Sequence, residues 1–128
     1  MASITRLDTS ERFSEAVVHN GVVFLAGQVP DAAACAVLDA DGAPSAYAQT
    51  RSVLEQVDAL LARAGSDKSR LLSATVYISG FEAAYAGMNK AWVEWLPAGC
   101  APARATVGNV TLAKNEWLVE IMVTAAVA

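Results

Sequence analysis

The sequence predicts one α+β domain in which two helices cover one face of a mixed β-sheet. Three observations lead to this prediction: two stretches carry apolar residues at helical spacing, a strictly alternating stretch separates them, and short strand-like segments occupy both ends of the chain. The expected order is β-β-(β)-α-β-α-β-β, where the bracketed strand would fall within the loop-rich residues 31–44. A length of 128 residues suits a single domain, 1–128.

The N-terminal part of the chain is expected to form a β-hairpin. Residues 1–12 are polar and would begin as a short edge segment, and residues 16–18 and 22–26 have the composition of strands. The dipeptide Asn20-Gly21 between them favours a tight hairpin turn. His19 adjoins this turn and is interpreted as exposed and structural.

Both helices are predicted from the spacing of their apolar residues. In residues 45–64, one face carries six apolar side chains, and Gly65 follows as a stop signal. In residues 81–96, large apolar side chains recur at intervals of three or four, and a Pro-Ala-Gly sequence ends the helix. These side chains are Phe81, Tyr85, Met88, Trp92 and Trp95. The two tryptophans are interpreted as core or interface residues rather than as a ligand cage.

The predicted sheet has one helix-covered face and one bare face. Residues 69–79 alternate, with Leu72, Ala74, Val76 and Ile78 on one side and Ser73, Thr75, Tyr77 and Ser79 on the other. Residues 103–110 and 117–127 are expected to be the last two strands. Two right-handed crossovers would place both helices on the same face. The bare, partly apolar face predicts a closed homo-oligomer, although this pattern does not fix the number of subunits.

Composition excludes several classes of partner. Nine basic residues stand against thirteen acidic ones, giving a net charge of −4, and no Lys/Arg cluster occurs, which argues against a nucleic-acid partner. Cys35 and Cys100 suggest neither a disulfide framework nor a metal site, and both are interpreted as spectator thiols. The apolar stretches are too short to span a membrane and the N-terminus lacks a signal-like core, so a cytoplasmic location is expected.

Arg104 and Glu120 are full charges within predicted strands, where a charge needs a partner. A guanidinium group matches the two oxygens of a carboxylate, and a carboxylate on a mostly apolar face can orient or deprotonate water. If the last two strands pair across the turn at residues 111–116, the two side chains would lie near each other. The alternative is a structural Arg–Glu pair at a subunit interface.

Five stretches of the chain resemble the RidA/YjgF family: residues 12–18, 25–29, 86–92, 102–106 (Pro-Ala-Arg-Ala-Thr) and 119–121 (Val-Glu-Ile). The resemblance implies a chorismate-mutase-like α+β fold and a homotrimer with a site at each of three subunit interfaces. It also implies hydrolysis of reactive enamine and imine carboxylates, such as 2-aminoacrylate, to 2-ketoacids and ammonia. This chemistry calls for no metal or organic cofactor.

The same resemblance implies roles for individual residues. Arg104 matches the family arginine that binds the substrate carboxylate, Glu120 the glutamate that orients the attacking water, and Gly27 a glycine whose backbone contacts the substrate. Three further site positions depart from the family pattern: Ala26 stands where many members have Ser, Phe13 where many have Tyr, and Thr106 where well-studied deaminases have Cys.

Two functions from different classes fit this site. The first is a deaminase, which needs both Arg104 and Glu120. The second is a non-catalytic carboxylate or ketoacid sensor, which needs only Arg104. Ribonuclease or translation-inhibitor activity has been attached to the family, but the acidic balance argues against it here, and chorismate-mutase activity would rest on fold analogy alone.

Overall fold

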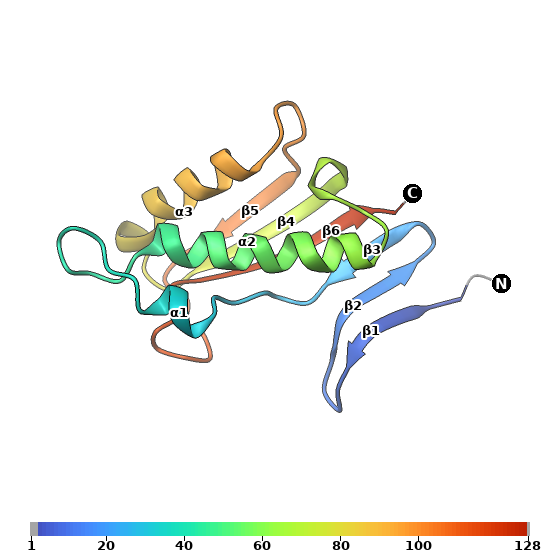
Figure 1. Cartoon of the computed structure of the whole chain (residues 1–128), viewed down its shortest axis with the longest axis horizontal. Helices are drawn as coiled ribbons and strands as arrows, with labels where there is room; N and C mark the ends of the chain where they lie inside the picture. Colours follow the sequence, from blue (N-terminus) through green and yellow to red (C-terminus); the bar gives the residue numbers. More distant parts are fainter. Residues whose placement is uncertain (1–2, 128) are drawn as a thin grey trace.

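The computed structural model describes residues 3–127, and these form an α+β domain built on one six-stranded sheet (Figure 1). The strands lie in the order β1-β2-β3-β6-β4-β5. Only β4 and β5 pair in parallel; every other neighbouring pair is antiparallel. The bounds are β1 Thr5–Thr9, β2 Ser14–His19, β3 Val22–Leu25, β4 Leu71–Ile78, β5 Ala103–Val107 and β6 Val119–Ala126.

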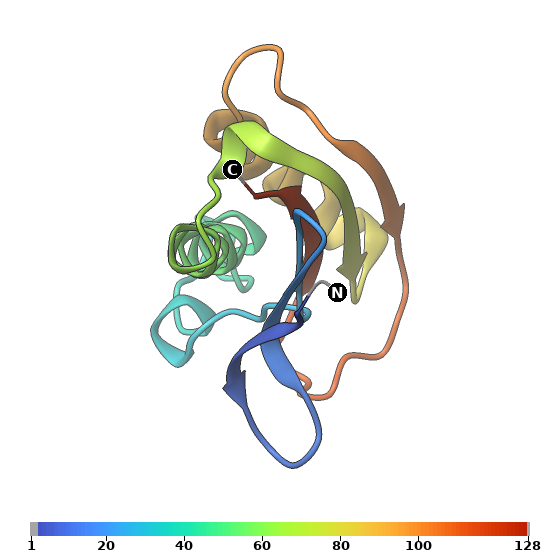
Figure 2. The ribbon, with the colours of Figure 1, turned by 90° about the vertical axis from the view of Figure 1, so that its right-hand side faces the viewer.

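Two long helices, α2 (Ala46–Arg63) and α3 (Phe81–Trp95), cover the same face of this sheet, as predicted (Figures 1 and 2). Helix α2 packs over β3 and β6, and α3 packs over β4. A one-turn helix α1 (Ala32–Cys35) occupies the segment where a loop with a short strand was expected, and a 3-10 helix η1 (Lys68–Arg70) precedes β4. Asp31 caps α1 by accepting a bond from Ala34 N at 2.8 Å, which accounts for this local helix.

The N-terminal hairpin follows the sequence prediction. Strand β1 is the expected edge strand, and β2 and β3 are joined at Asn20 and Gly21. Both turn residues have positive φ angles, 50° and 76°, which is the geometry that favours an Asn-Gly pair. His19 is half-buried, and its ring Nδ1 lies 3.2 Å from the carbonyl oxygen of Ser3, in keeping with a structural role.

The core lies between the helices and the covered face of the sheet. Its fully buried large side chains include Val53, Leu54, Val57 and Leu61 from α2, Met88 from α3, and Val76, Ile78, Val119, Ile121 and Val123 from β4 and β6. In β4, the predicted alternation holds from residue 73 onward. It fails at Leu72, because a register shift between Leu71 and Ser73 leaves the Leu72 side chain 48% exposed.

The last two strands do not pair with each other, so the condition under which Arg104 and Glu120 would lie close together is not met. Strand β4 lies between β5 and β6, pairing Ala74 with both Arg104 of β5 and Val123 of β6. The α3 crossover returns the chain parallel to β4 at the edge of the sheet, and residues 108–118 then carry it past β4 to the other side. Strand β5 ends at Val107, earlier than predicted, before Gly108 and the positive φ of Asn109 (56°).

The second face of the sheet carries no helix, as predicted. Phe24, Val107 and Met122 lie on it with exposed fractions of 48%, 40% and 41%. Ser73, Thr75 and Tyr77 lie among them, which gives the mixture of polar and apolar groups expected for this face. No helix within residues 3–127 is long and apolar enough to cross a membrane.

Ser45 is expected to stabilise the start of α2, because its side chain accepts a hydrogen bond from Ala48 N at 3.0 Å. Ser45→Ala should lower the free energy of unfolding by about 1 kcal/mol, since it leaves that helix-end N–H unsatisfied. Urea denaturation measures the change. Ser45→Asp keeps an acceptor and serves as the control; an equal loss in both variants would contradict the capping role.

Candidate functional site

Arg104 projects from the edge strand β5 toward the helices. It pairs with Ala74, which is buried against them, so Arg104 shares that face of the sheet. Its guanidinium lies over the indole ring of Trp92, with Cζ 5.4 Å from the ring centroid. Nη1 also donates to the sulfur of Met88 at 3.8 Å. Helix α3 therefore supplies both side chains that hold the arginine.

No carboxylate neutralises Arg104. Within residues 3–127, the one salt bridge joins Arg63 to Asp8, 2.7 Å apart on the surface. A half-buried guanidinium beside an apolar ring, with most of its N–H donors unused, has the chemistry to bind an anion. The geometry therefore does not support a structural Arg–Glu pair within one subunit.

Thr106 lies two residues further along β5, on the same face as Arg104 and beside Val76. Gly108 continues this row, and a Cβ there would come within 2.9 Å of the ring of Phe81. The absence of a side chain at Gly108 thus lets the first turn of α3 rest on the end of β5. Arg104 and Thr106 are one pair of candidate site residues, on the helix side of the sheet edge. This pair is the first half-site.

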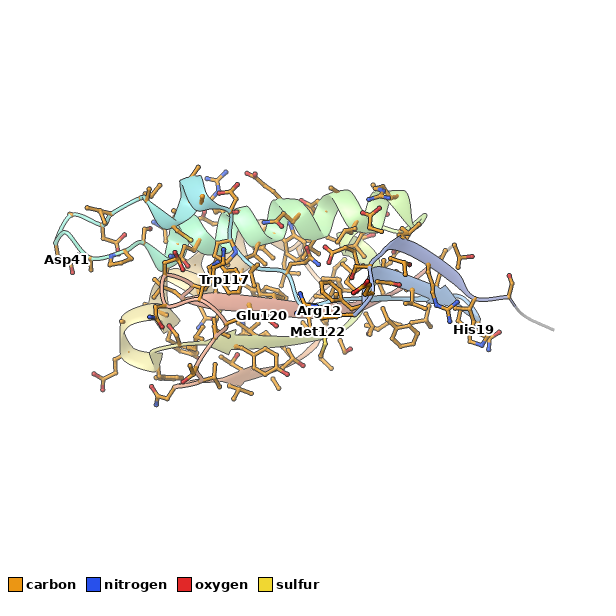
Figure 3. The ribbon with its side chains drawn as sticks, turned by 90° about the horizontal axis from the view of Figure 1, so that it is seen from below. Arg12, His19, Asp41, Trp117, Glu120 and Met122 are labelled. Carbon is orange, nitrogen blue, oxygen red and sulfur yellow. The ribbon has the colours of Figure 1, made fainter. Side chains whose placement is uncertain are left out.

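Glu120 lies on the opposite face of the sheet. It pairs with Tyr77, and it shares the uncovered face with Met122, two residues further along β6 (Figure 3). Alternation within β4, β5 and β6 therefore directs Arg104 and Glu120 away from each other. The structure does not bring these two residues together within one chain.

Gly27 and Glu120 are a second pair of candidate site residues, and this pair is the second half-site. Gln28 and Ile121 exchange backbone hydrogen bonds of 2.8 and 3.0 Å, which place Gly27 beside β6. A Cβ at Gly27 would lie 2.9 Å from Glu120 Cδ and closer still to Oε2. The Glu120 side chain therefore lies directly against the Gly27 backbone, in space that any larger residue at position 27 would make it leave.

Ala26 belongs to this second half-site, whereas Phe13 lies on a different edge of the sheet from Arg104. Ala26 precedes Gly27, and its carbonyl accepts a bond from Gln28 Nε2 at 3.0 Å. Phe13 is 51% exposed at the turn between β1 and β2, at the opposite edge of the sheet from Arg104. Neither side chain carries a hydroxyl group, so neither donates a hydrogen bond to a ligand.

Sequence reasoning missed the glutamines that position the second half-site. Gln49, fully buried on α2, donates to the carbonyl of Glu116 at 3.0 Å and accepts from Leu118 N at 2.8 Å. Gln56, seven residues further along α2, donates to the carbonyl of Val29 at 2.8 Å. Their place beside Val53 and Leu60 on the apolar stripe of the helix is the signal that would have found them.

The two cysteines stay outside these hydrogen-bonded arrangements. Burial raises the pKa of the Cys35 thiol, and the negative charge of Glu116 adds to the effect, which keeps the thiol protonated and unreactive. Cys100 is half-buried in a turn four residues before Arg104, where its N–H donates to the carbonyl of Pro97. Residues 3–127 contain no group of three His, Cys, Asp or Glu side chains arranged to hold a metal ion.

Comparison with known proteins identifies the family. The model of the family described as endoribonuclease L-PSP matches residues 3–127. A RutC family protein of Haemophilus ducreyi is 44% identical over 97% of both chains. The chain belongs to the RidA/YjgF family.

Two further RidA/YjgF relatives agree in sequence and structure. The RutC family protein YoaB of Escherichia coli is 41% identical over 98% of this chain and 99% of its own. The crystal structure of NMB1025, a YjgF family member from Neisseria meningitidis, superposes with a TM-score of 0.86 at 41% identity, covering 98% of this chain and 96% of that one. The sheet and helices described above are therefore those of the RidA/YjgF fold.

The contact between Gly27 and Glu120 can be tested by a double-mutant cycle. Gly27→Ala should destabilise the fold by up to about 1 kcal/mol, because the added methyl group has to displace the end of the flexible Glu120 side chain. Gly27→Ala combined with Glu120→Ala should recover most of this loss, as measured by urea denaturation. Additive losses in the double variant would show that the two positions do not compete for the same space.

Proposed function

We propose that this protein hydrolyses reactive 2-enamine and 2-imine carboxylates, such as 2-aminoacrylate, to 2-ketoacids and ammonia in the cytoplasm. The observation that carries the proposal is the Arg104 guanidinium, which is held against α3 with no protein carboxylate beside it. A small carboxylate is the anion whose two oxygens fit this fork. The apolar ring of Trp92 beside it lowers the local polarity and strengthens that attraction.

The proposed site combines half-sites from two copies of the chain. Arg104 and Thr106 of one copy would face Gly27 and Glu120 of its neighbour, because one chain directs these pairs to opposite faces of its sheet. Phe13, at the tip of the hairpin on the far edge, would reach toward a neighbouring copy in the same assembly. Such an arrangement makes assembly a requirement for catalysis.

The proposed assembly is a closed homotrimer of the chorismate-mutase-like type. Its support is the uncovered face of the sheet, where Phe24, Met122 and Val107 are 40% exposed or more. Exposed apolar side chains spread over one face of a small chain favour burial against a second copy. The resemblance to the RidA/YjgF family supplies the number three.

The reaction needs positioning more than strong chemistry. A protonated imine is already electrophilic at carbon, so the protein has to hold the carboxylate, fix the imine end and place one water. Arg104 would bind the carboxylate, the Gly27 backbone would contact the imine end, and Glu120 would aim the water and accept its proton. An enamine first becomes the imine by protonation at carbon. Water oxygen bonds to the imine carbon, Glu120 passes the proton taken from the water to nitrogen, and the C–N bond breaks to release ammonia and the 2-ketoacid.

Phe13, Ala26 and Thr106 differ from the RidA/YjgF pattern. These differences change the uncharged residues of the proposed site and leave its two charged residues, Arg104 and Glu120, in place. Two hydroxyl groups common in the family are missing, and Thr106 supplies a hydroxyl where deaminases carry a thiol. The binding of substrates with apolar side chains would be weakened least by the missing hydrogen bonds. The proposed reaction uses no metal or organic cofactor.

Two other functions are less well supported. A carboxylate sensor would need Arg104 but would not need a glutamate seated against a glycine backbone, as Glu120 is. The family description names an endoribonuclease, but the net charge of −4 and the lack of a Lys/Arg cluster offer no footprint for an RNA backbone.

Deaminase activity is tested with imines generated in place by an amino-acid oxidase. Wild type should accelerate 2-ketoacid release in competition with semicarbazide, which traps the remaining imine. Arg104→Ala should lower kcat/KM about 100-fold or more, because the substrate carboxylate loses its partner. Glu120→Gln should lower kcat by about 100-fold while binding of the 2-ketoacid pyruvate persists.

Both variants need to retain the circular dichroism spectrum and oligomeric mass of wild type for this comparison. Wild-type turnover that survives Arg104→Ala would remove the proposed role of the arginine. No acceleration by wild type, with Arg104-dependent binding of pyruvate, would leave the sensor as the function.

The two-copy site predicts complementation between inactive variants. When Arg104→Ala and Glu120→Gln chains are co-refolded in equal amounts, about one quarter of the sites in a cyclic assembly would carry both intact residues. Activity should therefore recover to about a quarter of the wild-type value. Each variant refolded alone is the control, and mixed samples that remain as inactive as the parents would mean that both residues act from one chain.

A further inference from the structure

The face of the Arg104 guanidinium is supported by a buried indole ring. We propose that Trp92 is a positioning residue for the carboxylate site, which it serves by fixing the plane of Arg104. This inference rests on the proposed carboxylate-binding role of Arg104. The residue does not touch the reacting atoms itself; it determines where the arginine presents its donors.

The need for such a support follows from the location of Arg104. It belongs to β5, which is an edge strand, so no further strand confines its side chain on the outer side. An arginine side chain has several rotatable bonds and loses rotamer entropy when it is fixed in one geometry. If the side chain is already ordered in the free protein, less entropy is lost on binding and the ligand binds more tightly.

Trp92 is suited to the task because it is itself immobile. Its side chain is 5% exposed and belongs to the hydrophobic core. Other cations also lie over aromatic rings, namely Arg51 and Lys90 over Tyr47, Lys68 over Trp95 and Lys114 over Trp117. Those rings are only half-buried, whereas Trp92 is buried. A cation attracted to a desolvated indole face is held more strongly than one at an exposed ring.

The contacts of Arg104 also decide which donors remain for a ligand. Trp92 covers one face of the guanidinium, and Nη1 donates to the sulfur of Met88. Within residues 3–127, Nε and Nη2 have no hydrogen-bond partner. These two atoms form one edge of the fork, and that edge can donate two parallel hydrogen bonds to a carboxylate. By fixing the plane of the guanidinium, Trp92 therefore directs Nε and Nη2 of Arg104 together toward a ligand.

A role confined to core packing would give a different result on substitution. Replacing Trp92 by Phe or by Leu removes buried volume and leaves a cavity in either case. Only Phe retains an aromatic face for the Arg104 guanidinium. Trp95 offers a matched control on the same helix: its ring centroid lies 5.6 Å from that of Trp92, and it supports Lys68 instead of Arg104.

The experiment measures pyruvate binding by calorimetry for the assembled wild type and for Trp92→Leu, Trp92→Phe and Trp95→Leu. The Nε–H resonance of Arg104, assigned with Arg104→Ala, reports the stacking, since the indole ring current shifts it upfield. Trp92→Leu should weaken binding about tenfold and abolish the shift, whereas Trp92→Phe should stay within about threefold and retain part of it. Trp95→Leu should stay within about twofold.

Three outcomes would overturn the inference. Trp92→Leu and Trp92→Phe could weaken binding equally, which is the mark of a packing defect. Trp92→Leu could abolish the ring-current shift and leave the Kd unchanged, which would show that the plane of Arg104 is irrelevant to binding. Wild type could fail to bind pyruvate, in which case Arg104 has no carboxylate role for Trp92 to support. Binding that depends on Trp92 without any imine turnover would support the inference and remove only the proposed deamination.

Discussion

The position of β4 between β5 and β6 is the constraint on which the rest of the molecule depends. Because β4 pairs with both strands, its alternation sets a common pleat, in which Ala74, Arg104 and Val123 share the helix side. Tyr77 and Glu120 share the other side by the same rule. A single strand thus separates the Arg104 guanidinium from the Glu120 carboxylate, although both belong to one small sheet.

Helix α2 supports the backbone next to Gly27 and Glu120 without contributing a candidate site residue of its own. Its apolar stripe packs on the sheet, and within that stripe Gln49 and Gln56 bind backbone groups on the two segments that flank the contact between Gly27 and Glu120. Buried amides of this kind satisfy backbone groups that would otherwise lack partners, so they fix loop positions with little freedom. Gln49 and Gln56 therefore hold the backbone segments around Gly27 and Glu120 from the helix side of the sheet. Neither glutamine would touch a ligand.

Sequence patterns predicted local structure well and long-range pairing poorly. The two helices and the Asn20–Gly21 turn depend on spacing within short segments, and both were correct. The order of β4, β5 and β6 depends on how a crossover and a long loop place distant segments, and spacing contains no information on that choice. For the same reason Glu120 was a conditional neighbour of Arg104, and Trp92, interpreted as a core or interface residue, was not recognised as its contact on α3.

The opposed directions of Arg104 and Glu120 have a consequence for a newly made chain. A folded single chain carries the receptor on one surface and the carboxylate on another, so in the proposed two-copy site it would be chemically silent until it meets a second copy. Catalytic capacity would then depend on the concentration of the protein as well as on its folding, and dilution alone would switch it off. Two co-expressed relatives that exchange subunits would also create hybrid sites, each with one half-site from either parent.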